Sequence, residues 1–350
     1  LFLALAAAPT FAQTDPRTLP AVTLADIAEL GFFTAPDMDG AGSGEVHSLT
    51  YSGPALGMGP DGKSLYISCH DWFTAYARIS IPTLGQRASI IEPCRLVATT
   101  AINPSDPNQR RLGGVLSWGG RTIVSAFSYY DGNGSATSSH FANGAGPFRV
   151  GTLNPGFVGG YMGVIPQEWR GLLGGPALTG QCCLSIIGRT SYGPSVGVAL
   201  RDHTGRVSPV ASQMIGCYPE AHQTNGIYHS AGNLAGFGMA TSIVGVAFPA
   251  NTSTVLFMGR QGSTWCYGHG TPNQSLHQTP HPSGGVWCYD PASNDKGGHG
   301  FPYFAAIWGY RAADLADVAS GAKQPWEVQH AWIAALPGGL KGLRSGTYDP

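Results

Sequence analysis

The most regular feature of the hydrophobic pattern is a short apolar run that ends in a small residue and continues into polar and aromatic residues. Runs of this length and composition predict strands rather than helices. In two places a second apolar run follows closely, at 75–80 and 196–200, and glycine or proline lies at the joints. The pattern therefore predicts antiparallel meanders. The four copies are KSLYISCHDW (63–72), RTIVSAFSYYDG (121–132), CLSIIGRTSYG (183–193) and STVLFMGRQGS (253–263).

The copies recur roughly every 60 residues, a spacing typical of propeller blades and related arrays. We therefore expect an all-β fold, a β-propeller of five to seven antiparallel blades, extending over residues 26–350. Two short helices are expected between strands. One is at 166–175, where proline begins and glycine ends the segment, and the other is at 310–321, which is rich in alanine and also ends in glycine.

One copy carries a recognisable turn. In LGMGPDGKSLYIS (56–68) an apolar run enters Pro60-Asp61-Gly62 and leaves as a second run. Together with ARIS (77–80), this phrase resembles a blade of the NHL and SMP-30/lactonase-type propellers, and the whole chain resembles exported bacterial propellers. The lactonase-type resemblance implies calcium held on the axis by Glu, Asn and Asp. Only six glutamates occur here and none lies where a repeated strand ends, which weakens that enzyme hypothesis.

The two ends of the chain suggest a longer gene. LFLALAAAPTFAQ (1–13) reads as the remnant of a secretory signal peptide, and 14–25 reads as a polar leader. The final SGTYDP (345–350) stops inside a turn, so we expect the propeller to be truncated there. The stretch LGFFTAP (30–36) is then a candidate strand to complete the interrupted last blade.

The composition limits the classes of partner that the protein can bind. There are 19 basic and 20 acidic residues, and only four of the basic residues are lysines, so no cationic stripe exists for nucleic acid. No apolar run reaches the roughly 20 residues that a membrane-spanning helix requires. We expect a monomer that binds a small molecule or a glycan.

The seven cysteines indicate an oxidising compartment, so we expect a secreted or periplasmic protein. Cys266 and Cys288 lie in near-identical contexts, TWCYG and VWCYD, and are predicted to pair. Cys182 and Cys183 could each take a distant partner among residues 69, 94 and 217, which would leave one thiol free, and the sequence leaves this connectivity open.

The strand ends supply the candidate site. Equivalent strands of a propeller end on the same face, so residues far apart in sequence should converge there. Arginines offer forked donors and aromatic rings offer stacking faces, which suits a ligand with hydroxyl or carboxylate groups. The predicted ligand-binding residues are His70, Asp71, Trp72, Tyr129, Tyr130, Asp131, Arg189, Ser191 and Arg260.

Metal sites are a second possibility, and calcium is the cofactor that the pattern indicates. Asp37, Asp39 and Glu45 alternate with glycines, and DGNGS (131–135) spaces oxygen ligands similarly. Three histidines, residues 269, 277 and 281, lie in the excursion between Cys266 and Cys288 and are weak candidates for zinc or copper.

One motif for a nucleophilic serine is present and is rejected. GPSVG (193–197) matches Gly-x-Ser-x-Gly around Ser195, but the residues that follow predict a strand where a nucleophile elbow needs a helix. No catalytic residue is therefore assigned. The leading hypothesis is an exported propeller that binds a polar or carbohydrate-like ligand in a funnel at one face. Two alternatives stay open, a calcium-assisted hydrolase of the lactonase or esterase type and a protein-interaction scaffold.

Overall fold

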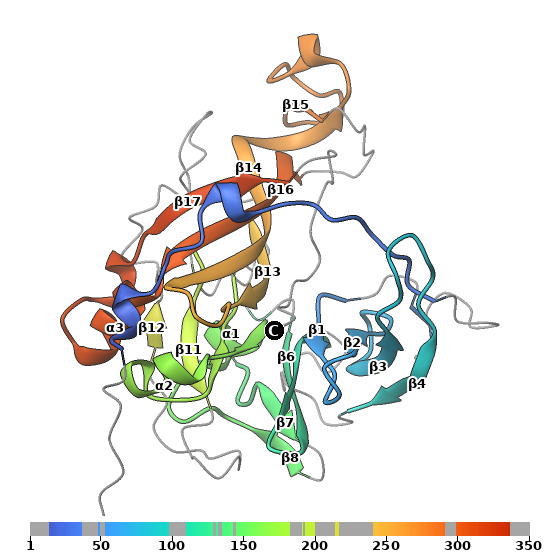
Figure 1. Cartoon of the computed structure of the whole chain (residues 1–350). Helices are drawn as coiled ribbons and strands as arrows, with labels where there is room; N and C mark the ends of the chain where they lie inside the picture. The colour runs from blue at the N-terminus through green and yellow to red at the C-terminus, as the bar shows by residue number, and fades with distance from the viewer. Residues whose placement is uncertain are drawn as a thin grey trace, which may run out of the picture.

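A computed structural model shows a mainly β protein, and its described residues form four largely antiparallel sheets (Figure 1). In the first three sheets four consecutive strands pair in sequence order, which is the meander of a propeller blade, and the fourth sheet follows the same path with a fifth strand at its side. The structure describes residues 14–36, 48–49, 53–97, 110–128, 131, 135–142, 145–182, 191, 193–199, 214–216, 241–290 and 299–336. Several blade-like sheets are thus confirmed, whereas ring closure between the first and fourth sheets is not seen in the described part of the chain.

The strands of the first sheet are β1 (Leu56–Met58), β2 (Ser64–Ser68), β3 (Ala75–Ser80) and β4 (Ile90–Leu96). Those of the second are β5 (Arg110–Trp118), β6 (Arg121–Ser128), β7 (His140–Ala142) and β8 (Ala145–Phe148). The third contains β9 (Met162–Val164), β10 (Ala177–Thr179), β11 (Val196–Ala199) and β12 (Met214–Gly216). The fourth contains β13 (Ser242–Ala247), β14 (Thr254–Thr271), β16 (His299–Arg311) and β17 (His330–Ala335), and β15 (Trp287–Tyr289) pairs in parallel with β14.

In the part of the chain that the structure describes, the helices are few and short, as expected. They are α1 (Pro155–Val158), α2 (Gln167–Leu173) and α3 (Ala312–Ser320), with 3-10 turns η1 (Pro16–Thr18), η2 (Leu24–Asp26), η4 (Gln274–Leu276) and η5 (Pro325–Glu327). Gly174 and Gly321 end α2 and α3 in the left-handed conformation, which explains why glycine follows both helices.

The predicted turn before β2 forms as the sequence indicates. Gly62 adopts a φ of 63°, a conformation that glycine reaches without strain. The Asp61 carboxylate accepts hydrogen bonds from the Lys63 amide at 3.0 Å and the Ser64 hydroxyl at 2.6 Å. These two contacts, that of Ser64 first, lower the pKa of Asp61 because they favour its charged form. Local chemistry is therefore sufficient to join β1 to β2.

The third sheet departs from the predicted alignment. Its second strand is β10, whereas the sequence pattern assigned the equivalent strand to 183–193, of which 183–190 and 192 lie outside the described residues. Three residues, Ala177, Leu178 and Thr179, form β10, and all three are buried. A strand this short leaves little periodic signal in the sequence, whereas the longer apolar run that follows it has the stronger strand pattern.

The first strands of neighbouring sheets pack against one another at glycines. A Cβ atom added to Gly57 in β1 would overlap the Val115 carbonyl oxygen in β5, and one added to Gly163 in β9 would lie 3.0 Å from the Val246 side chain in β13. Between these two contacts, a Cβ atom added to Gly114 in β5 would lie 2.8 Å from the Met162 amide nitrogen in β9. Side chains would hold these backbones apart, so glycine is what allows β1, β5, β9 and β13 to lie side by side in order.

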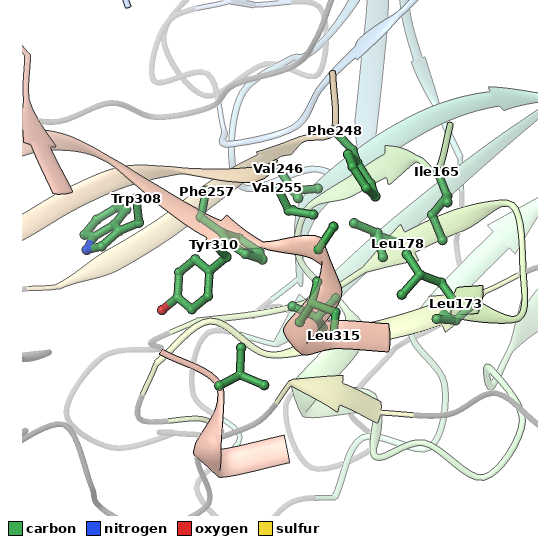
Figure 2. Close-up of a cluster of buried hydrophobic side chains, with 14 of the residues drawn as sticks. Ile165, Leu173, Leu178, Val246, Phe248, Val255, Phe257, Trp308, Tyr310 and Leu315 are labelled. Atoms are coloured by element: carbon green, nitrogen blue, oxygen red, sulfur yellow. The ribbon is translucent and has the colours of Figure 1, made fainter. Parts of the chain in front are cut away.

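The largest apolar core lies between the third and fourth sheets and the helices that cover them (Figure 2). Phe257 of β14 and Tyr310 of β16 meet edge to face with ring centroids 5.1 Å apart, an arrangement that adds to simple burial. Trp169 of α2 is completely buried, and its indole NH donates to the Thr252 carbonyl at 2.8 Å. This core fixes α2 against the loop that precedes β14.

An arm extends from the fourth sheet (Figure 1). β14 and β16 pair with each other from Thr254↔Arg311 to Gly268↔His299, whereas β13 and β17 accompany only the first part of this ribbon. An isolated two-stranded ribbon is marginally stable in water. The predicted disulfide between Cys266 and Cys288 is confirmed, and it staples the far end of the arm.

A second disulfide corrects one expectation. Cys69 pairs with Cys94 inside the first sheet, so neither is available to Cys182 or Cys183 as the sequence analysis proposed. Both disulfides indicate an oxidising environment outside the cytoplasm. None of the helices in the described residues is long and apolar enough to cross a membrane.

The stretch 30–36 also lies elsewhere than expected. Thr34 pairs in parallel with Arg87, in the turn between β3 and β4 of the first sheet, and not with the last sheet. The residues of the interrupted last blade, 337–350, lie outside the described residues.

Candidate functional site

Each sheet carries a buried polar side chain where its second strand leaves the sheet. These residues are His70 after β2, Asp131 after β6, Gln181 after β10 and Gln261 where β14 passes the end of β13. Their exposed fractions are at most 8%. Buried polar groups need partners, so this repeated position is where the fold places hydrogen-bonding chemistry.

The first of these ends combines a buried imidazole with an exposed indole. His70 is 2% exposed and Trp72 is 64% exposed, with ring centroids 4.9 Å apart in a T-shaped arrangement. The His70 Nδ1 atom accepts a hydrogen bond from the Trp72 amide at 3.3 Å. The His70 ring therefore packs against the Trp72 ring, and the exposed part of the indole can stack on a ligand.

An ion pair beside Trp72 joins the first two sheets. The Arg111 guanidinium of β5 lies 2.6 Å from the Asp71 carboxylate and also donates to the Asp71 carbonyl at 2.6 Å. Both side chains are partly exposed, at 18% for Arg111 and 26% for Asp71. The two bonds from Arg111 to Asp71 hold the loop after β2 in place. Because both charged groups reach solvent, they can also form hydrogen bonds with the hydroxyl groups of a ligand.

Asp131 accepts hydrogen bonds from residues that follow it in the sequence. One carboxylate oxygen accepts from the Ser135 amide at 2.7 Å and from the Ser135 hydroxyl at 2.8 Å, and the other accepts from the Ala136 amide at 3.1 Å. These bonds join Asp131 to the end of the 131–135 stretch, whose spacing of oxygen ligands suggested calcium. The predicted neighbours Tyr129 and Tyr130 lie outside the described residues.

The remaining predicted binding residues lie in the other sheets. Arg260 is half-buried in β14, opposite Ser242 of β13 and Ala305 of β16. Ser191 is completely buried in the third-sheet region, and Arg189 lies outside the described residues. The contacts described above thus bring together the cluster of His70, Asp71 and Trp72, with Arg111 added.

Ser195 has a structural role, as the sequence analysis inferred. β11 begins at the next residue, so the helix that a nucleophile elbow requires is replaced by a strand. The Ser195 hydroxyl accepts from the Gln181 amide at 2.9 Å and lies within hydrogen-bonding distance of two backbone carbonyl groups. It is completely buried, which removes it from any substrate.

The proposed metal ligands Asp37, Asp39 and Glu45 lie outside the described residues. Across the described ranges, no group of three or more His, Cys, Asp or Glu side chains is arranged to hold a metal ion. In the arm, His269 and His281 stack with ring centroids 3.5 Å apart, and Trp287 meets His281 edge to face at 4.2 Å. The two stacked imidazoles pack with the indole as an aromatic cluster.

Two polar residues of this region, Arg111 and Gln181, were not predicted from the sequence. Arg111 precedes an apolar run, where arginine is common, and only its contact with Asp71 in another sheet reveals its role. Gln181 was missed because the third strand end was placed too late in the chain. A search for a polar residue two positions after every short buried strand would have found it.

A comparison with models of protein families finds none that matches this chain, and a comparison with curated proteins finds no match either.

Proposed function

We propose that this protein is an exported β-propeller that binds a polar, carbohydrate-like ligand at the face where the second strands of its sheets end. Trp72 carries the proposal. It is a large aromatic side chain, 64% exposed, on a short loop where burial would be expected. Sugars present apolar CH faces that stack on indole rings and hydroxyl groups that bond to charged side chains beside them.

The surroundings of Trp72 suit this role. The loop that carries it is held by the disulfide from Cys69 to Cys94, by the buried His70 ring and by the bonds from Arg111 to Asp71. A rigid loop loses little conformational entropy on binding, which improves affinity. The Asp71–Arg111 pair adds donors and acceptors of both signs at the edge of the indole, so neutral or acidic sugars with vicinal hydroxyl groups are the favoured ligand class.

Side-by-side packing of the four blade-like sheets supports the propeller part of the proposal. The first strands β1, β5, β9 and β13 contact one another in order, as blades do around an axis. The two disulfides support export, with a secreted or periplasmic location.

Glycan-array binding followed by calorimetry on the best ligand tests the proposal. We expect the wild type to bind a sugar, and Trp72→Ala to weaken binding about fivefold, because losing one stacking ring costs about 1 kcal/mol. Phe32→Ala is the matched control, since Phe32 is an equally exposed aromatic, at 71%, on the N-terminal segment. Absence of sugar binding by the wild type, or equal weakening by both variants, would refute the assignment.

A further inference from the structure

We propose that residues 14–36 form a clasp that holds the first and last sheets of the array together. The segment contacts the fourth sheet with its first half and the first sheet with its second half (Figure 1). In the figure the blue chain runs from beside α3, past β17, and across to the side of β3 and β4. The inference is independent of the proposed ligand.

The anchor on the fourth sheet has three backbone contacts. The Ser253 amide donates to the Pro20 carbonyl at 2.9 Å, and the Val22 amide donates to the Thr254 hydroxyl at 3.0 Å. The Val22 carbonyl accepts from the indole NH of Trp332 in β17 at 2.9 Å. The segment thus touches both the start of β14 and the edge strand of the same sheet.

An ion pair extends this anchor to α3. The Arg17 guanidinium of η1 lies 3.6 Å from the Asp317 carboxylate. Both side chains are partly exposed, so this pair contributes less than the backbone contacts. Pro16 beside it is buried, which indicates that η1 packs on the protein rather than standing free in solvent.

The anchor on the first sheet has a short parallel ladder. The Gly85 amide donates to the Phe32 carbonyl at 2.7 Å, the Thr34 amide donates to the Gln86 carbonyl at 3.1 Å, and the Ala88 amide donates to the Thr34 carbonyl at 2.9 Å. All three partners lie in the turn between β3 and β4. The segment is thereby tied to the turn that leads into β4, the last strand of the first sheet.

The stretch between the two anchors is short and partly ordered. Thr23 and Asp26 form a capping box in which the Asp26 carboxylate accepts from the Thr23 amide and hydroxyl, each at 2.8 Å. Because the link is short and ordered, attachment of one anchor to its sheet keeps the other anchor close to its own sheet. The segment thus links the first and fourth sheets, which is the task that a shared blade performs in a closed ring.

A cleavable link tests this inference on the full chain. A protease recognition sequence is inserted after Ala28, in the exposed stretch between the anchors, and the protein is compared before and after cutting. Because both samples have the same composition, a failure to fold is seen in the uncut sample and is not confused with loss of the clasp. The matched control carries the same insertion between Gly284 and Gly285, two exposed glycines at the tip of the arm.

Hydrogen exchange and thermal unfolding report the outcome. After cutting at Ala28 we expect the melting temperature to fall by about 5 °C. We also expect amide exchange to rise about tenfold both at Ser253 in the fourth sheet and at Ala88 in the first. Cutting the arm should leave both amides unchanged. The clasp is refuted if cutting at Ala28 changes neither amide, or if only Ser253 responds, because the segment would then be an extension of one sheet alone.

Discussion

A buried histidine in the second sheet predicts how the protein responds to acid. His140 begins β7 and is 1% exposed. Its Nε2 atom lies 2.9 Å from the Thr179 hydroxyl, which donates its own hydrogen to the Val158 carbonyl at 2.6 Å. The Thr179 oxygen must therefore accept from Nε2–H, and Nδ1 is left to accept from the Ser139 hydroxyl at 2.8 Å. The hydrogen bonds thus assign the neutral imidazole, with both nitrogens satisfied.

Burial lowers the pKa of His140 from 6.5 to about 3, because the charged form is costly away from water. The unfolded chain takes up a proton below pH 6.5 that the folded chain refuses down to about pH 3. Stability is therefore complete above pH 6.5 and is lost progressively as the pH falls. At pH 4.5 the loss is about 3 kcal/mol, from about two pH units at 1.36 kcal/mol each. That is a large share of the 5–15 kcal/mol that typically stabilises a domain.

Urea unfolding at pH 7.5 and 4.5 measures this effect. His140→Gln should be less stable than the wild type at pH 7.5, because it disturbs the bonds to Ser139 and Thr179. Its further loss on going to pH 4.5 should be smaller than that of the wild type by about 3 kcal/mol, since the titrating group is gone. Comparing the two proteins removes the contribution of the carboxylates to the loss of stability in acid, because the carboxylates titrate in both proteins.

His330→Gln is the comparison variant. Burial also lowers the pKa of His330, but this side chain is less deeply buried, so its removal should reduce the acid sensitivity by less. In parallel, NMR titration of the wild type should show the His140 ring unprotonated from pH 8 to pH 4.5. The reasoning fails if His140→Gln loses as much stability in acid as the wild type, or if the His140 ring titrates near pH 6.5.

Two further predictions concern packing and the arm. Gly57→Ala should destabilise the protein by about 2–3 kcal/mol, because the new methyl group overlaps the Val115 carbonyl. Gly171→Ala, in α2 with nothing within 4 Å of the new atom, should stabilise by up to about 1 kcal/mol in the same chemical denaturation assay. Equal effects would show that the β1–β5 contact is not tight. Replacing Cys266 and Cys288 by serine should cost the arm about 3 kcal/mol, seen as faster proteolysis within it while the body keeps its melting temperature. Faster cleavage throughout the chain would show that the arm is not a local unit.

Much of the strand framework was determined by the sequence itself. β2, β3, β6 and β11 lie where alternating or continuous apolar runs predicted them, because a run of β-branched and aromatic residues between glycine or proline turns has few other conformations. The turn at Gly62, the stop of α3 at Gly321 and the pairing of Cys266 with Cys288 also follow from local chemistry or local context.

The tertiary structure decided what depends on contacts between distant residues. The ion pair between Asp71 and Arg111 joins two sheets, and the sequence around either residue does not predict it. Residues 30–36 are apolar enough to join any open sheet edge, and only the assembled fold selects the turn before β4 over the last sheet. The neutral state of His140 is likewise set by the layers that bury it. Sequence patterns report how each residue meets its near neighbours, whereas partner choice and desolvation are properties of the packed whole.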